Sequence, residues 1–102
     1  MIQVAYRISY AKPTQHHLKF LSGRQRKTIF DAVDEQLTNE PTVETGRRKR
    51  MRPNRLAAWE LRIGILRAYY DVFLVPEPIV LVLAVGIKQR NVVRIGGEVV
   101  VL

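Results

Sequence analysis

Two strands joined by a turn are visible in the stretch Trp59-Glu60-Leu61-Arg62-Ile63-Gly64-Ile65-Leu66-Arg67-Ala68-Tyr69-Tyr70-Asp71-Val72-Phe73-Leu74. Its first five residues alternate between apolar and polar side chains, which is typical of a strand with one buried face. Gly64 permits a turn or a bulge, and a second strand is expected over residues 66–74. By this alternation we expect Trp59 and Tyr70 in the core. Tyr69 is then left on the same face as Arg67, where it is accessible to solvent.

Toward the C-terminus, the stretch Pro76-Glu77-Pro78 predicts a rigid connection to another strand. Residues 79–86 are apolar at every position, which indicates a central strand covered on both faces. The tail, residues 95–102, is apolar again after two glycines. It is expected to form an edge strand, or a segment that a partner protein covers.

Toward the N-terminus, apolar residues alternate from Ile2 to Tyr10, which predicts a strand that ends at Lys12-Pro13. Thr14 is expected to cap a short helix. Ser22 and Gln25 have the spacing of a capping box at the start of a second helix. The residues expected on the inward face of the two helices are Leu18, Leu21, Ile29, Phe30, Val33 and Leu37.

The order of these elements predicts the fold class. A strand is followed by a helix hairpin and then by an antiparallel meander of strands. We therefore expect a single α+β domain over residues 1–102, in which the helix hairpin packs on one face of a small, mostly antiparallel, twisted sheet.

The chain of 102 residues has 17 Lys and Arg against 9 Asp and Glu, a net charge of +8. Residues 46–67 contain eight basic residues and one acid, so they carry +7 of it. This segment is either a solvated loop or a surface that binds phosphates through released counterions. The arginine content favours phosphate binding. The residues expected to bind RNA are Arg47, Arg48, Lys49, Arg50, Arg52, Arg55 and Arg90.

Several classes of chemistry are disfavoured. Cysteine is absent, which excludes disulfides, thiolate catalysis and cysteine zinc sites. His16 and His17 are adjacent and cannot both ligate one metal from a helix, and no phosphate-binding glycine loop is present. The longest apolar stretch, residues 79–87, is about half of the roughly 20 residues that a spanning helix needs. The N-terminus lacks the pattern of a signal peptide, so a soluble cytoplasmic protein without metal or cofactor is expected.

Three motifs in this order resemble the RelE/ParE superfamily of type II toxins. They are Leu37-Thr38-Asn39-Glu40-Pro41, the strand pair of residues 59–72, and Val85-Gly86-Ile87-Lys88-Gln89-Arg90-Asn91. The resemblance implies the β-α-α-β-β-β fold of that family. RelE-like members are metal-independent ribonucleases that cut mRNA on the ribosome. ParE-like members poison DNA gyrase, and a co-expressed antitoxin neutralises both kinds.

The resemblance also implies roles for individual residues. Arg67 matches the arginine that contacts the scissile phosphate. Arg62 and Lys88 fall where the ribonucleases carry basic residues of the other type. Glu60 is either a general base or a plain solvent-exposed residue. Arg94 stands near the position at which some members carry a functional tyrosine.

The leading hypothesis is a ribosome-dependent mRNA endoribonuclease in which Arg67, Arg62, Lys88 and Glu60 act on the phosphodiester. Tyr69 and Arg94 are further catalytic candidates. The alternative is a ParE-like gyrase inhibitor, or an inactive member that binds only its antitoxin. An acidic antitoxin is the expected partner in a hetero-oligomer, docking on the apolar tail at residues 99–102 and covering the basic segment.

Overall fold

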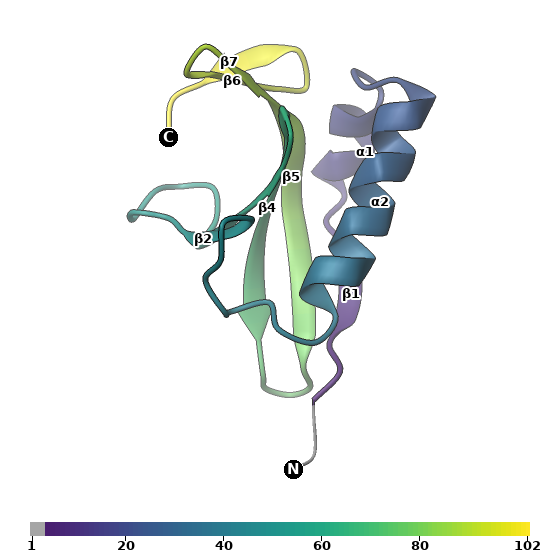
Figure 1. Ribbon diagram of the computed structural model, residues 1–102, viewed down its shortest axis with the longest axis vertical. Helices are drawn as coiled ribbons and strands as arrows, with labels where there is room; N and C mark the ends of the chain where they lie inside the picture. Colours follow the sequence, from purple (N-terminus) through teal and green to yellow (C-terminus); the bar gives the residue numbers. More distant parts are fainter. Residues whose placement is uncertain (1–3) are drawn as a thin grey trace.

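In the computed structural model, which describes residues 4–102, two helices pack against one face of a seven-stranded sheet (Figure 1). The α+β class and the position of the helix pair were both predicted correctly. The elements in chain order are β1 (Arg7–Tyr10), α1 (Pro13–Leu18), α2 (Gly23–Leu37), β2 (Arg48–Arg50), β3 (Trp59–Ile63), β4 (Leu66–Phe73), β5 (Ile79–Gln89), β6 (Val92–Ile95) and β7 (Glu98–Val100).

The sheet is built around the long strand β5. Strands β2 to β7 run antiparallel in chain order, so each strand pairs with the next. The other edge of β5 is shared between two strands. Its first part pairs in parallel with β1, ending at Tyr10 opposite Val82, and its last part pairs with β6, beginning at Gly86 opposite Ile95. In the gap between β1 and β6, the Val85 amide donates a 3.4 Å hydrogen bond to Nδ1 of His17 in α1.

Three strand predictions need correction. The basic segment contains a short strand, β2, which pairs with β3 and was not predicted. The C-terminal tail forms part of a hairpin, β6–β7, instead of one strand over residues 95–102. The first strand begins at Arg7, and the predicted contribution of Ile2 lies outside the described residues.

The start of α2 agrees with the sequence, whereas two helix predictions do not. The Ser22 hydroxyl accepts a hydrogen bond from the Gln25 amide at 3.0 Å, and the Gln25 side chain accepts one from the Ser22 amide at 2.9 Å, which is the predicted capping box. Thr14 is not a cap. It lies inside α1 and its hydroxyl donates to the carbonyl of Ala11 at 2.6 Å. Phe30 is 38% exposed and was expected to face inward; its ring makes a T-shaped contact with that of Tyr10 in β1, with the ring centres 5.4 Å apart.

The main core fills the space between the helices and the sheet. Trp59 and Tyr70 are buried in it as predicted, with their rings stacked 6.1 Å apart. The Tyr70 hydroxyl donates a 2.7 Å hydrogen bond to the carbonyl of Pro41, which anchors the end of the helical segment to the sheet. A second, smaller core lies on the opposite face of the sheet and contains Ala57, Tyr69, Ala84, Val93 and Ile95.

Candidate functional site

The sheet face that points away from the helices is concave (Figure 1). Most of the predicted catalytic residues lie on this face. Because side chains alternate along a strand, the register of β3, β4 and β5 puts them on the same face. Arg62 pairs with Arg67 and Glu60 pairs with Tyr69. The five residues of this group, called the Glu60 cluster below, are Glu60, Arg62, Arg67, Tyr69 and Lys88.

Glu60 is the acidic centre of this cluster and is only 6% exposed. One carboxylate oxygen, Oε1, accepts a 2.7 Å hydrogen bond from Nε of Arg62. The other, Oε2, lies 3.9 Å from Nε of Arg67. A buried carboxylate is costly unless cations and donors compensate it, and these two arginines provide that compensation. The expectation that Glu60 is a plain solvent residue is therefore wrong.

Arg67 is held in place by the turn that precedes it. Its Nη1 donates to the carbonyls of Gly64 at 2.7 Å and of Leu66 at 2.8 Å. Its side chain is only 13% exposed, whereas that of Arg62 is 42% exposed. Arg67 is thus a fixed and mostly buried cation, whereas Arg62 is more accessible to solvent.

Tyr69 was predicted to be accessible to solvent. This prediction is wrong, because the side chain is fully buried. Residues distant in sequence, among them Ala57 and Val93, cover it as part of the second core. Its hydroxyl and Nε of Arg67 are buried atoms with no hydrogen-bond partner among the described residues. Burial and then the charge of Glu60 raise the pKa of Tyr69, while Arg67 opposes the shift.

Two neighbouring pockets open over the cluster, each of about 440 Å³, and both are lined by Glu60 and Lys88. The first is basic, with Lys49, Arg52 and Arg62 among its lining residues. The second is apolar and is lined by the valines of β6, β7 and the tail. Leu102 lines both pockets. The cluster is therefore reached through a surface that is cationic on one side and apolar on the other.

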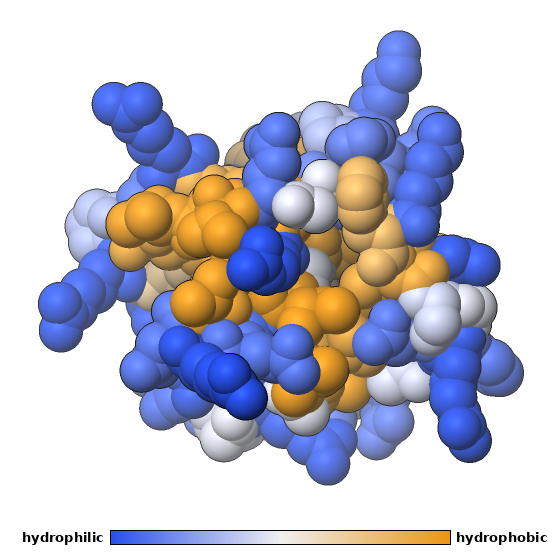
Figure 2. All heavy atoms as spheres, turned by 90° about the horizontal axis from the view of Figure 1, so that it is seen from above, coloured by the Kyte–Doolittle hydropathy of each residue, from blue (hydrophilic) through white to orange (hydrophobic). Residues whose placement is uncertain are grey.

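The apolar side continues to the end of the molecule that carries β6 and β7. Figure 2 looks onto this end and shows apolar side chains gathered there, surrounded by long hydrophilic ones. The exposed apolar residues of these strands and of the tail are Val92, Val99, Val101 and Leu102. A contiguous apolar area with a hydrophilic rim is typical of an interaction surface.

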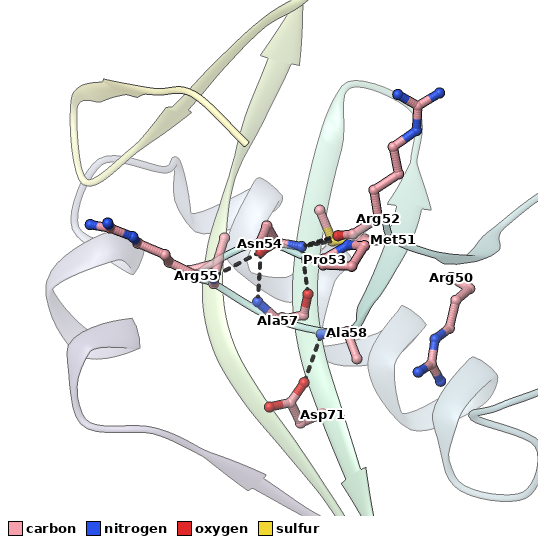
Figure 3. A pocket seen from close by; sticks show the side chains of 10 residues that line it. Arg50, Met51, Arg52, Pro53, Asn54, Arg55, Ala57, Ala58 and Asp71 are labelled. Carbon is pink, nitrogen blue, oxygen red and sulfur yellow. Dashed lines mark hydrogen bonds between the residues drawn. The ribbon is translucent and has the colours of Figure 1, made fainter.

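The loop between β2 and β3 is organised by one side chain, Asn54 (Figure 3). Its Oδ1 accepts hydrogen bonds from the amides of Leu56 at 2.7 Å and Ala57 at 3.0 Å, and its Nδ2 donates to the carbonyls of Arg52 at 2.7 Å and Ala57 at 2.8 Å. The side chains of Arg52 and Arg55 extend away from this loop in different directions (Figure 3). This role of Asn54 was not predicted, although asparagine after proline is a turn signal.

The predicted RNA-binding residues divide into an exposed group and one exception. The exposed group is Arg47, Lys49, Arg50, Arg52, Arg55 and Arg90. Arg48 is the exception, because its side chain is buried. Its Nε donates to the carbonyl of Val43 at 2.8 Å and its Nη1 to both oxygens of Gln36 at 2.9 Å, so it ties the basic segment to α2. Arg50 lies over the ring of Trp59, 5.5 Å from its centre, on the helix side of the sheet.

Arg94 was predicted to join the catalytic residues, but it lies on the other face of the sheet. It pairs with Ile87, which packs against the helix-side core. Its neighbours Val93 and Ile95 are buried on the concave face, so alternation along β6 turns Arg94 away from the Glu60 cluster. Arg90 lies in the turn between β5 and β6.

Neither helix within residues 4–102 has the length and apolarity to span a bilayer. Over the same residues, no group of three or more His, Asp or Glu side chains is arranged to hold a metal ion. No protein-family model and no curated protein matches this chain.

Proposed function

We propose that this chain is the toxin of a type II toxin–antitoxin system, a RelE-like endoribonuclease that cuts mRNA on the ribosome. The observation that carries the proposal is the position of Glu60, which lies between Arg62 and Arg67 at the edge of an open basic pocket. A carboxylate and several cations on one accessible face are the groups that metal-independent RNA cleavage requires. The three motifs that resemble the RelE/ParE superfamily support the same interpretation.

In the proposed reaction, Lys49 and Lys88 hold the RNA phosphates at the basic pocket. Glu60 accepts the proton of the ribose 2′-hydroxyl, and the 2′-oxygen forms a bond to the adjacent phosphorus. Arg62 and Arg67 stabilise the negative charge that develops on the phosphate. The bond to the 5′-oxygen breaks, and this oxygen takes a proton from Lys88. The products are a 2′,3′-cyclic phosphate and a 5′-hydroxyl.

The proposed setting is the cytoplasm, with an acidic antitoxin as partner. Such a protein complements the +7 segment, residues 46–67, and its apolar side chains fit the surface formed by Val92, Val99 and Leu102. The exposed edge of β7 offers backbone groups for strand addition. Co-purification of the chain with a small acidic protein encoded next to it tests this part. A neighbouring acidic protein that does not bind would contradict it.

The main experiment is induced expression with separate measurements of translation, mRNA integrity and DNA supercoiling. We expect translation to stop first and mRNAs to be cut within codons. Lys88→Gln should remove both effects. Lys27→Gln is the matched control, because Lys27 is an exposed cation on α2 that pairs only with Asp31 among the described residues. Intact messages on stalled ribosomes would overturn the proposal.

One observation favours a second function, that of a ParE-like gyrase inhibitor or of a member that only binds its antitoxin. Arg67 donates hydrogen bonds to the carbonyls of Gly64 and Leu66, which is a structural role. Under this alternative, expression blocks supercoiling and induces the SOS response while translation continues at first. Lys88→Gln then leaves the toxic effect unchanged.

A further inference from the structure

The β5–β6 hairpin carries a second cationic pocket, on the opposite side of the sheet from the Glu60 cluster. Its volume is about 330 Å³, and its lining residues are Ile87, Gln89, Arg90, Val92 and Arg94. Gln89 pairs with Val92 and Ile87 pairs with Arg94, so these four side chains share the helix-side face. The two arginines thus come together from the turn and from β6.

The backbone of this hairpin is strained at the arginine. Arg90 and Asn91 are the two central residues of the turn, and both have positive φ angles, 52° and 64°. Such turns favour Asn or Gly at both positions. Asn91 fits this preference, whereas an arginine in the left-handed region is uncommon. Because strained residues cluster at functional sites, the strain at Arg90 is a second sign, beside the pocket, that its side chain is used.

The charges of this pocket are available to a ligand. Among the described residues, neither Arg90 nor Arg94 takes part in an ion pair, and both are exposed. The guanidinium group has a planar fork that matches the oxygens of a phosphate. The pocket therefore has the chemistry of a phosphate site.

The order of the cations along the hairpin indicates what kind of phosphate-containing ligand this pocket binds. Lys88 lines the pockets of the concave face, Arg90 lies at the turn, and Arg94 lies on the far face. Together they form a cationic track around the end of the sheet. A single-stranded nucleic acid, with a phosphate at every residue, can follow such a track, whereas one free anion occupies only one point of it.

We propose that an RNA strand bound at the Glu60 cluster continues around the β5–β6 hairpin and places a phosphate between Arg90 and Arg94. This inference rests on RNA as the ligand of the proposed function. It does not depend on cleavage. It assigns Arg94 to substrate binding on the far face, in place of the catalytic role expected from the sequence.

The test measures binding of a fluorescently labelled 15-nucleotide single-stranded RNA as a function of salt concentration. All proteins carry Glu60→Gln, so that cleavage does not interfere. Arg94→Gln and Arg90→Asn are compared with Arg24→Gln, which removes an exposed cation from α2. Each test variant should bind more weakly and lower the slope of log K against log salt by about 0.7, the value of one phosphate contact with a single strand.

Arg90→Asn also separates binding from folding. Since asparagine suits the left-handed turn better than arginine, this variant should unfold at the same or a higher temperature while it binds RNA less well. Slopes equal to that of Arg24→Gln in both variants would overturn the inference. Failure of the ribonuclease proposal would give a different result, namely intact mRNA after induced expression of the unmodified protein.

Discussion

Oε2 of Glu60 in β3 lies 3.9 Å from Nε of Arg67 in β4, on the concave face of the sheet. The partner oxygen Oε1 is hydrogen-bonded to Arg62 at 2.7 Å. Glu60 is therefore oriented by one arginine and faces the other, which is itself fixed by two backbone carbonyls. This arrangement makes the role of Glu60 testable, because its charge can be removed with little change in shape.

Glu60→Gln should abolish most of the RNA cleavage while the protein remains folded. If Glu60 is the general base, the rate falls by about 10²- to 10⁴-fold. The cost in stability is about 1–3 kcal/mol, because an amide replaces one member of a charge-assisted hydrogen bond. Cleavage of ribosome-bound mRNA and thermal unfolding measure the two effects. A variant that cleaves at the rate of Lys27→Gln would rule out this role.

Tyr69→Phe should raise the free energy of unfolding. The Tyr69 hydroxyl is buried without a hydrogen-bond partner among the described residues, and an unsatisfied buried group costs about 1–3 kcal/mol. Phenylalanine keeps the ring, which packs in the second core with Val93 and Ile95. Denaturant unfolding at neutral pH measures the change. A loss of stability would show that the hydroxyl makes a stabilising contact, and a loss of cleavage alone would assign it to the site.

Stability should decrease on acidification because of His17. Burial, and then the charge of His16, lower the pKa of His17 below its ordinary value of 6.5, so the unfolded chain takes up the proton more readily. The contribution of the neutral imidazole is complete above pH 6.5 and is lost as the pH falls from 6.5 to the lowered pKa. Protonation of Nδ1 also removes the acceptor of the Val85 amide.

The measurement for His17 is the unfolding temperature between pH 8 and pH 5. The matched variant is His17→Gln, which can still accept a hydrogen bond and does not titrate. It should show a smaller drop in this range than the unmodified chain. Equal drops in the two proteins would exclude His17 as the cause.

Gly86→Ala should be strongly destabilising, whereas Gly46→Ala should be nearly neutral. A Cβ atom at Gly86 would lie 2.2 Å from the carbonyl oxygen of Arg94, so the backbone of β6 would have to move. Overpacking of this kind costs about 1–3 kcal/mol or more. At Gly46 no atom lies within 4 Å of the added Cβ. Thermal unfolding of the two variants measures the difference, and similar values would contradict the close packing of β5 on β6.

The sequence was sufficient for the features that depend on local pattern. Alternation placed Trp59 and Tyr70 in the core, and the spacing of Ser22 and Gln25 identified the start of α2. In the structure, Arg62 and Arg67 lie opposite each other on one face, since β3 and β4 pair in a continuous register.

The errors concern residues whose environment is made by distant parts of the chain. Tyr69 is buried because the loop that contains Asn54 and the strand β6 cover it. The sequence of the strand that carries Tyr69 does not indicate this contact. Arg48 satisfies its guanidinium with carbonyls near the end of α2. Arg94 was expected near the site from the resemblance alone, and the β5–β6 hairpin that turns it to the other face was not predicted, because its turn at Arg90 and Asn91 lacks glycine.

Asn54→Ala should loosen the loop between β2 and β3 and weaken RNA binding without reaching the Glu60 cluster directly. The substitution removes all four hydrogen bonds that the Asn54 side chain makes to the backbone. We expect a loss of about 1–3 kcal/mol in the free energy of unfolding, because buried and half-buried backbone groups lose their partners. Arg52 and Arg55 are then no longer presented in fixed directions, so the affinity for single-stranded RNA falls. Their charges remain, so the salt dependence stays close to that of the unmodified chain.

Arg52→Gln is the matched comparison and should reduce the salt slope by about 0.7. Anisotropy titrations of both variants at several salt concentrations measure this, and an Asn54→Ala variant with unchanged affinity would show that the order of this loop does not matter for binding.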